Sequence, residues 1–127
     1  MIKVWVVDDD EEMVHAVQLM LKLLDCETRS FFSPHPVAQA LLTGECPDLV
    51  ILDILMGAVS GLDLLGFIRK RPEWKQLPIV MLSTEASDVM VDRALSLGAD
   101  PYVTKPVILD ELEAAMNKAF NARGKRN

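Results

Sequence analysis

Four short apolar runs of the sequence end in polar side chains whose types could together carry phosphoryl chemistry. These side chains are Asp8, Asp9, Asp10, Asp53, Ser83, Thr84, Glu85 and Lys105. Each of them, taken alone, is compatible with an ordinary turn or helix-capping residue. Acids, a hydroxyl and a lysine at the ends of four separate runs are, however, a rare coincidence. We therefore interpret them as parts of one site.

The physical logic of this set is the binding of a cation and a phosphoryl group. Two carboxylates about 4 Å apart repel each other by roughly 4 kcal/mol at an effective dielectric of about 20. A divalent cation reverses this repulsion, and Mg²⁺ favours oxygen ligands of this kind. A lysine and a hydroxyl stabilise phosphoryl oxygens, and a remaining carboxylate can act as the nucleophile. Asp53 is the candidate nucleophile because apolar residues precede and follow it, which is unlike a turn.

The elements that must position these side chains alternate between strands and helices. Apolar runs predict strands at residues 2–7, 27–32, 49–52, 79–82 and 102–104. Apolar spacings of three and four, together with capping signals, predict helices at residues 11–24, 34–42, 62–71, 87–97 and 109–120. Such alternation is typical of βαβ units, so we expect an α/β domain with a doubly wound, five-stranded parallel sheet and five helices. In these sheets, sites lie outside the carboxyl ends of the strands.

The composition indicates one acidic globular domain. The chain has 127 residues, half of them apolar and a quarter charged, and a formal net charge of -6. This charge argues against direct binding of nucleic acid, which requires a basic face. No apolar run approaches the ~20 residues that span a membrane, and we see no secretory signal. We expect a cytoplasmic protein in which Cys26 and Cys46 stay reduced, with a domain at residues 1–121 and a basic tail or linker stub at 122–127.

Four sequence fragments carry a resemblance to a known family. The fragments "VVDDDEEM", "DLVILDILM", "LPIVMLSTE" and "GADPYVTKP" resemble, in order and spacing, the receiver domain of two-component response regulators, including chemotaxis regulators. The resemblance covers about residues 2–120. It implies a flavodoxin-like fold with strand order 2-1-3-4-5. It also implies a phosphoacceptor switch that is not an enzyme and catalyses only its own phosphorylation and slow dephosphorylation. The phosphoryl group would come from a sensor histidine kinase or a phosphotransfer protein.

The resemblance also implies a role for individual residues. Asp53 matches the phosphoacceptor of the family. Asp8 and Asp9 match its acid pair, which with Asp53 and the backbone carbonyl of Leu55 would form a site for Mg²⁺ or Mn²⁺. Lys105 matches the lysine that contacts the phosphoryl group. Asp10 matches no ligand position, so we interpret it as a loop or cap residue.

Three further residues match the conformational machinery of the family. Ser83 matches the switch hydroxyl and Tyr102 the switch aromatic residue. The bond before Pro106 matches one that is cis in the family. The resemblance implies that the fourth helix, fifth strand and fifth helix present the surface for a downstream effector. Phosphorylation-dependent formation of a homodimer is left open.

The sequence departs from the family pattern at several positions near the site. Gly57 stands where proline is typical, and Ser60 where an acid is typical. Ile108 replaces the usual capping residue of the last helix, so we expect that helix to begin less firmly. Leu55 and Glu85 occupy positions that modulate the lifetime of the phosphoryl group. Because a leucine cannot hydrogen-bond an attacking water, we expect slow self-hydrolysis.

Three other functions share parts of this pattern. A phosphatase of the haloacid dehalogenase kind would use Asp8 and Asp10, but it usually needs a further acidic pair after the lysine. A flavodoxin-like FMN binder would place its phosphate in the first loop, where three aspartates would repel it. A receiver-like module that docks proteins without phosphorylation remains open, because all acceptor groups are present.

Overall fold

Five parallel strands form one sheet through the middle of the molecule. The structure, a computed structural model, describes residues 1–56, 59–84, 90–97 and 101–123. The strands of the sheet are β1 (Ile2–Val7), β2 (Cys26–Phe31), β3 (Leu49–Asp53), β6 (Ile79–Ser83) and β7 (Tyr102–Thr104). Their order is β2-β1-β3-β6-β7, which is the predicted 2-1-3-4-5 because β6 and β7 are the fourth and fifth strands of this sheet. The second strand begins and ends one residue earlier than predicted.

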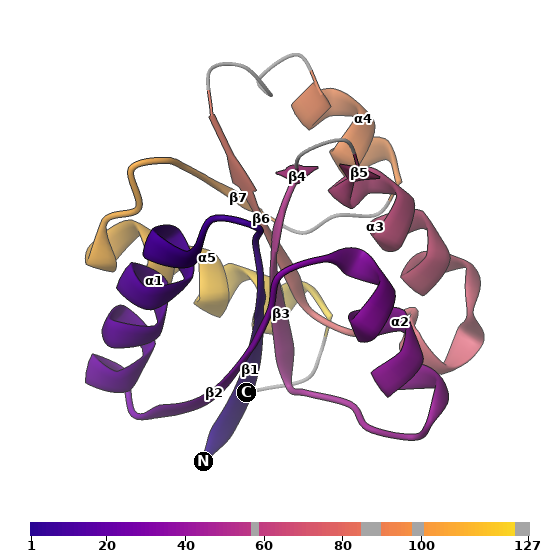
Figure 1. The fold of residues 1–127 in the computed structure, drawn as a ribbon, viewed down its shortest axis with the longest axis horizontal. Coiled ribbons are helices and arrows are strands. Elements are labelled where there is room, and N and C mark those ends of the chain that lie inside the picture. The colour runs from indigo at the N-terminus through magenta and orange to yellow at the C-terminus, as the bar shows by residue number, and fades with distance from the viewer. Residues whose placement is uncertain (57–58, 85–89, 98–100, 124–127) are drawn as a thin grey trace.

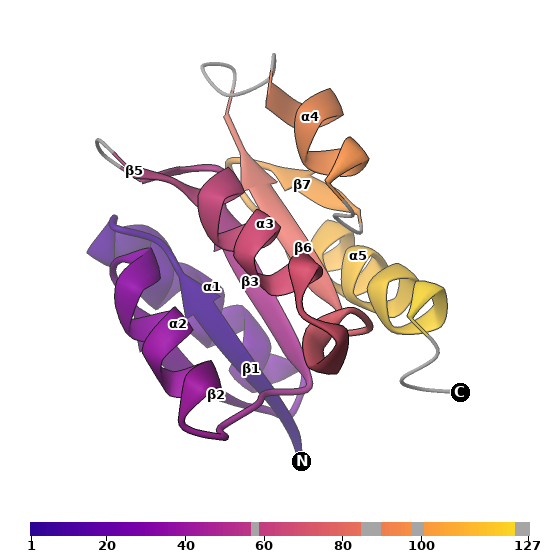
Figure 2. The ribbon, with the colours of Figure 1, turned by 90° about the vertical axis from the view of Figure 1, so that its right-hand side faces the viewer.

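Helices cover both faces of the sheet. They are α1 (Glu11–Leu23), α2 (Pro34–Leu42), α3 (Gly61–Lys70), the 3-10 turn η1 (Pro72–Trp74), α4 (Val91–Ser96) and α5 (Leu109–Ala122). Figure 1 shows α1 and α5 on one side of the sheet and α2, α3 and α4 on the other, and Figure 2 shows the second group from the front. The predicted beginning of α4 near residue 87 lies outside the described residues, as does most of the predicted tail. Within the described ranges, no helix has the length and apolarity needed to cross a membrane.

The two faces of the sheet bury two separate apolar clusters. Every residue of β3 and β6 is buried, as is expected for central parallel strands that are covered on both faces. Along β1 the side chains alternate between the clusters. Trp5 and Val7 pack toward α2 and α3, whereas Val4 and Val6 pack toward α1 and α5. The continuous apolar character of these runs is therefore explained by burial on both sides.

The helix ends follow the capping signals of the sequence. The side chain of Asp10 accepts hydrogen bonds from the backbone N–H groups of Glu12 and Met13, at 3.0 and 3.3 Å, so the interpretation of Asp10 as a cap is confirmed. Proline follows the N-cap Ser33 at the start of α2, as predicted. Ile108 provides no side-chain hydrogen bond at the start of α5.

A short hairpin, which the sequence did not indicate, joins β3 to α3. It consists of β4 (Leu55–Met56) and β5 (Val59–Ser60), which pair in antiparallel fashion. The hairpin returns the chain to the end of β3, where the Gly61 N–H donates a hydrogen bond to the Ile54 carbonyl at 2.7 Å. A Cβ atom on Gly61 would lie 2.0 Å from the carbonyl oxygen of Asp53. Only glycine fits this position, and Ser60 caps α3 by accepting from the Leu62 N–H at 3.0 Å.

Candidate functional site

The predicted site residues lie at the carboxyl ends of four strands, at the top of the sheet in Figure 1. Asp8 directly follows β1, and Asp53 is the last residue of β3. Ser83 is the last residue of β6, and Lys105 directly follows β7. Parallel strands end at the same edge of a sheet, and this common edge brings the four positions together.

Three carboxylates form a compact acidic cluster at this edge. Asp8, Asp9 and Asp53 each offer one oxygen, and these oxygens all lie within 4.8 Å of one another. Asp8 and Asp53 are buried, with 0% and 3% of their surface exposed, whereas Asp9 is exposed to solvent. The cluster is therefore closed on the side of the sheet and open to solvent at Asp9. Hard oxygen atoms in this arrangement suit a divalent cation.

The backbone holds the buried acids in place. The Asp8 N–H donates to the Phe31 carbonyl at 3.1 Å, and Asp8 Oδ1 accepts a hydrogen bond from the Asp10 N–H at 3.0 Å. Asp53 Oδ1 lies 3.4 Å from the Leu55 N–H. The backbone amide of Asp10 thus has a positioning role that sequence reasoning missed, and the available signal was that an Asp side chain commonly accepts from the N–H two residues further on.

Lys105 lies between the two buried carboxylates. Its Nζ atom is 2.9 Å from Asp8 Oδ2 and 3.3 Å from Asp53 Oδ2, and 14% of its side chain is exposed. Its backbone N–H donates to the Ser83 carbonyl at 2.7 Å, which ties the end of β6 to this loop. The Lys105–Pro106 bond is cis, so this prediction is confirmed. Ser83 is itself buried, at 1% exposed.

The electrostatics of the cluster favour a proton or a cation on the acids. Burial and the nearby carboxylate of Asp8 raise the pKa of Asp53 to about 7, although the Lys105 ammonium opposes this rise. Burial works to lower the pKa of Lys105, but its contacts with the two carboxylates outweigh burial and raise that pKa.

The acids carry more negative charge than the lysine can balance. Among the described residues of the cluster, three carboxyl groups lie close together, and a single ammonium group, that of Lys105, contacts two of them. Asp8 Oδ2 is fully buried, and among the described residues it has no donor other than the Lys105 ammonium at 2.9 Å. A buried carboxylate oxygen in this state has capacity for a further positive ligand. The donor set therefore fits a divalent cation.

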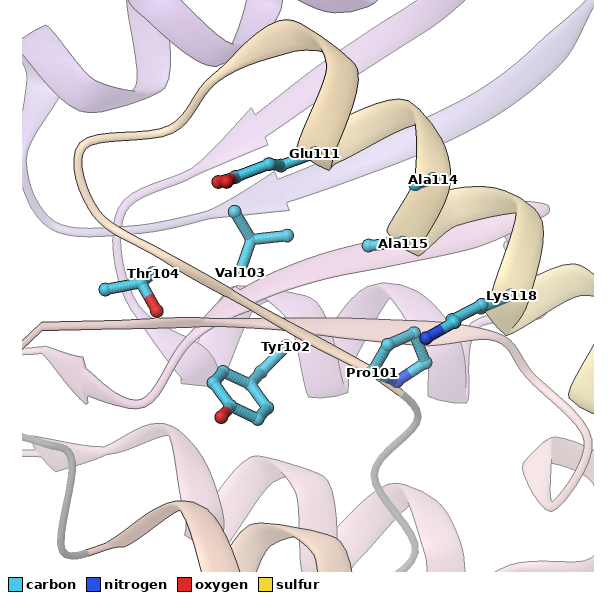
Figure 3. A pocket seen from close by; sticks show the side chains of 8 residues that line it. All are labelled: Pro101, Tyr102, Val103, Thr104, Glu111, Ala114, Ala115 and Lys118. Atoms are coloured by element: carbon cyan, nitrogen blue, oxygen red, sulfur yellow. The ribbon is translucent and has the colours of Figure 1, made fainter.

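Tyr102, the predicted switch aromatic residue, lies at the surface. It belongs to the edge strand β7 and is 43% exposed. Figure 3 shows its ring on the opposite side of the strand from Val103, whose side chain points toward α5. A hollow of about 340 Å³ lies between β7 and α5, lined in part by Tyr102, Glu111 and Lys118. The predicted modulator Glu85 lies outside the described residues, while Leu55 is partly buried beside the acids.

Comparison of the sequence with known families identifies relatives of this chain. The sequence model for the response regulator receiver domain matches residues 4–117. The chain is 36% identical over 123 residues to the phosphate regulon transcriptional regulatory protein PhoB of Rhizobium meliloti (strain 1021), with 97% of this chain and 53% of PhoB covered. It is also 36% identical over 113 residues to the transcriptional regulatory protein CpxR of Klebsiella pneumoniae, with 88% of this chain and 46% of CpxR covered. The chain thus spans about half the length of these relatives.

Solved structures show the same fold. A putative response regulator from Chloroflexus aurantiacus superimposes with a TM-score of 0.86 at 27% identity, covering 94% of this chain and 97% of that protein. NtrX from Brucella abortus superimposes with a TM-score of 0.85 at 30% identity, covering 98% of this chain but only 28% of NtrX. The similarity therefore extends over nearly all of this chain and, in the second case, over one part of a longer protein.

Proposed function

Because this chain belongs to the response regulator receiver domain family of two-component systems, we propose that it is a phosphorylation-dependent switch in which Asp53 carries the phosphoryl group. Membership of this family favours a receiver domain over the two alternatives of an FMN binder and a phosphatase. The observation that carries the proposal is the convergence on Asp53 of Asp8, Asp9 and Lys105. A docking module without phosphorylation is the alternative that the experiment below separates.

Asp53 has the surroundings of a nucleophile that is held ready for reaction. Because its pKa is raised to about 7, the metal-free Asp53 carboxyl is partly protonated near neutral pH. The Lys105 ammonium at 3.3 Å favours the ionised carboxylate, which is the reactive form. In the proposed reaction an oxygen of Asp53 forms a bond to phosphorus, and the bond between phosphorus and the donor breaks. Lys105 can then turn its ammonium group toward the phosphoryl oxygens.

Asp8, Asp9 and Asp53 would hold Mg²⁺ or Mn²⁺, with the Leu55 carbonyl as a further ligand. The fit rests on the three clustered carboxyl groups and on the buried Asp8 oxygen, whose one donor among the described residues is Lys105. When bound, such a cation neutralises charge on the incoming phosphoryl oxygens. Asp8 and Asp9 lie in the loop directly after β1, and Asp53 is the last residue of β3, so the neighbouring strands set their spacing.

The switch would pass from Ser83 to Tyr102 on neighbouring strands. In this proposal the Ser83 hydroxyl donates a hydrogen bond to the phosphoryl oxygen, and Tyr102 moves inward from its exposed position. The register pairs Met81 with Tyr102 and Ser83 with Thr104, so a shift at the end of β6 is directly adjacent to β7. The surface of α4, β7 and α5 would then bind a downstream effector or a second phosphorylated copy. The donor would be a sensor histidine kinase or a phosphotransfer protein.

Phosphorylation by a small acyl phosphate tests the central role of Asp53. We expect the wild-type chain to gain the mass of one phosphoryl group when it is incubated with acetyl phosphate and Mg²⁺, and not when EDTA is present. Asp53→Asn should gain none. Asp63→Asn is the matched control, because Asp63 is an exposed acid on α3. An unlabelled wild type, or a labelled Asp53→Asn variant, would contradict the proposal.

The response of Tyr102 tests the switch separately. Tyr102 is the single tyrosine of the chain, so ring labelling of tyrosine reports on it alone in NMR spectra. Beryllofluoride with Mg²⁺ mimics an aspartyl phosphate and should shift the Tyr102 resonances. Unchanged resonances in a protein that has bound beryllofluoride would contradict the role of Tyr102 and leave that of Asp53 standing.

A further inference from the structure

The outer edge of β2 offers backbone groups that no other described strand uses. β2 pairs with β1 only, on the opposite side of the sheet from β7. The Phe31 carbonyl accepts from Asp8 of the β1 side, so the backbone groups of Glu27, Arg29 and Phe31 point toward β1. Those of the alternate residues Cys26, Thr28 and Ser30 therefore point outward. Such an edge is a template for pairing with another strand.

Two opposite charges flank the middle of this edge. Glu27 and Arg29 are exposed and lie on the same face of the strand, on either side of Thr28. The Arg29 guanidinium lies 4.7 Å from the centre of the Phe31 ring and 5.5 Å from that of Trp5. It forms an ion pair with Glu45, in which both side chains remain about half exposed. A hollow of about 180 Å³ lies over this part of the strand.

We propose that β2 pairs with β2 of a second copy in antiparallel fashion, about a two-fold axis at Thr28. In this register the outward residues meet each other: Thr28 faces Thr28, and Cys26 faces Ser30 of the second copy. The symmetry repeats the pair of Cys26 with Ser30, so three pairs in all would exchange about six backbone hydrogen bonds. Glu27 then lies opposite Arg29 of the second copy, and the symmetry repeats this pair. The two sheets become one continuous sheet.

The charge pattern selects this register and also selects a second copy as the partner. A shift of two residues in one direction places Glu27 opposite Glu27, and a shift in the other direction places Arg29 opposite Arg29. Like charges at directly opposed positions are destabilising, whereas opposite charges stabilise the pair. A shift of one residue would place each outward-pointing residue opposite a residue whose backbone groups point toward β1, so the hydrogen-bonded pairs could not form. The edge is thus complementary to itself in a single antiparallel register.

The neighbouring helix presents apolar surface on the same edge. Gln18 of α1 donates a hydrogen bond to the Thr28 hydroxyl at 3.2 Å, which places α1 beside the proposed axis. Leu19 and Leu23 of α1 are 52% and 72% exposed. Pairing at Thr28 brings the two α1 helices to one face of the joined sheet, where Leu19 is available for burial. The interface lies at the opposite edge of the sheet from β7, and we expect it to form without phosphorylation.

Charge reversal and its compensation test this interface in the whole chain without a phosphodonor. Sedimentation velocity should show a concentration-dependent monomer–dimer equilibrium of the wild type between about 1 µM and 1 mM. Arg29→Glu or Glu27→Arg alone turns both attractive pairs into repulsive ones and should raise the dissociation constant at least about tenfold. The combined Glu27→Arg and Arg29→Glu variant restores opposite charges and should return to within about threefold of the wild type.

Controls distinguish pairing at this edge from changes in the fold or in the ion pair of Arg29 within the chain. Glu45→Gln removes the partner of Arg29 within the chain without changing the edge, so it should leave the dimer intact. Circular dichroism of each variant checks that the fold is kept. A wild type that stays monomeric over the whole concentration range overturns the proposal. A monomer that binds another protein at this edge overturns it as well. A dimer that is insensitive to the single reversals, or that the combined variant fails to restore, also overturns it.

Discussion

Replacing Asp53 by asparagine should stabilise the metal-free protein at alkaline pH. The side chain is 3% exposed and its carboxylate shares the cluster with that of Asp8. Burial and the charge of Asp8 raise its pKa to about 7 even though Lys105 opposes the rise. An ionised Asp53 therefore lowers the free energy of unfolding of the protein. Asparagine has nearly the same shape without the charge.

The sign and the size follow from the two pKa values. Because the pKa of Asp53 rises from 3.8 to about 7 on folding, the folded state keeps a proton that the unfolded state loses in this window. Stability therefore falls as the pH increases from about 4 to about 7, and the full cost is present above that range. The difference of about 3 pH units corresponds to about 4 kcal/mol as an upper limit. Relaxation of the site reduces this figure, so we expect asparagine to gain about 1–3 kcal/mol at pH 8 and almost nothing at pH 4.

Urea unfolding with EDTA at pH 4, 6 and 8 measures this difference directly. Other groups that titrate in both proteins cancel when the wild type and Asp53→Asn are compared. Asp63→Asn serves as the control for the same substitution at an exposed position outside the cluster. A stability difference that stays constant from pH 4 to pH 8, or an Asp53→Asn variant that is less stable at pH 8, would refute the reasoning.

Three further outcomes are expected. Mg²⁺ should raise the melting temperature of the wild type by several degrees in a thermal shift assay, because a bound cation stabilises only the folded cluster. Asp8→Asn should lose most of this rise, and an undiminished rise in that variant would place the cation elsewhere. Leu55→Asn should shorten the lifetime of the phosphorylated protein several-fold, measured by intact mass over time, because an amide can hold the attacking water; an unchanged lifetime would count against that role. Gly61→Ala should cost about 2–3 kcal/mol in urea unfolding, because its Cβ would meet the Asp53 carbonyl oxygen at 2.0 Å. Gly66→Ala, where a Cβ meets nothing within 4 Å, should instead be neutral or stabilising, and equal effects at both glycines would contradict the argument.

Much of the fold follows from local patterns in the sequence. Runs such as residues 79–82 predict buried strands because a strand covered on both faces must be apolar throughout, and β6 is buried at every position. Asp10 predicts the start of α1 because its side chain only needs to reach N–H groups two and three residues away. The hairpin of β4 and β5 escaped prediction because its pairs are short and its apolar residues continue the pattern of β3.

The sequence by itself determined which chemical groups stand at the ends of the strands, because strand ends are set by local apolar runs and turn residues. Only the tertiary structure decided how these groups act on one another. Asp8, Asp53 and Lys105 are far apart in the chain, and their contacts of 2.9 and 3.3 Å exist because β1, β3, β6 and β7 are hydrogen-bonded side by side. Burial by that sheet and its helices, together with the neighbouring charges, raises the pKa of Asp53, and no local pattern of residues encodes a desolvation that distant segments create.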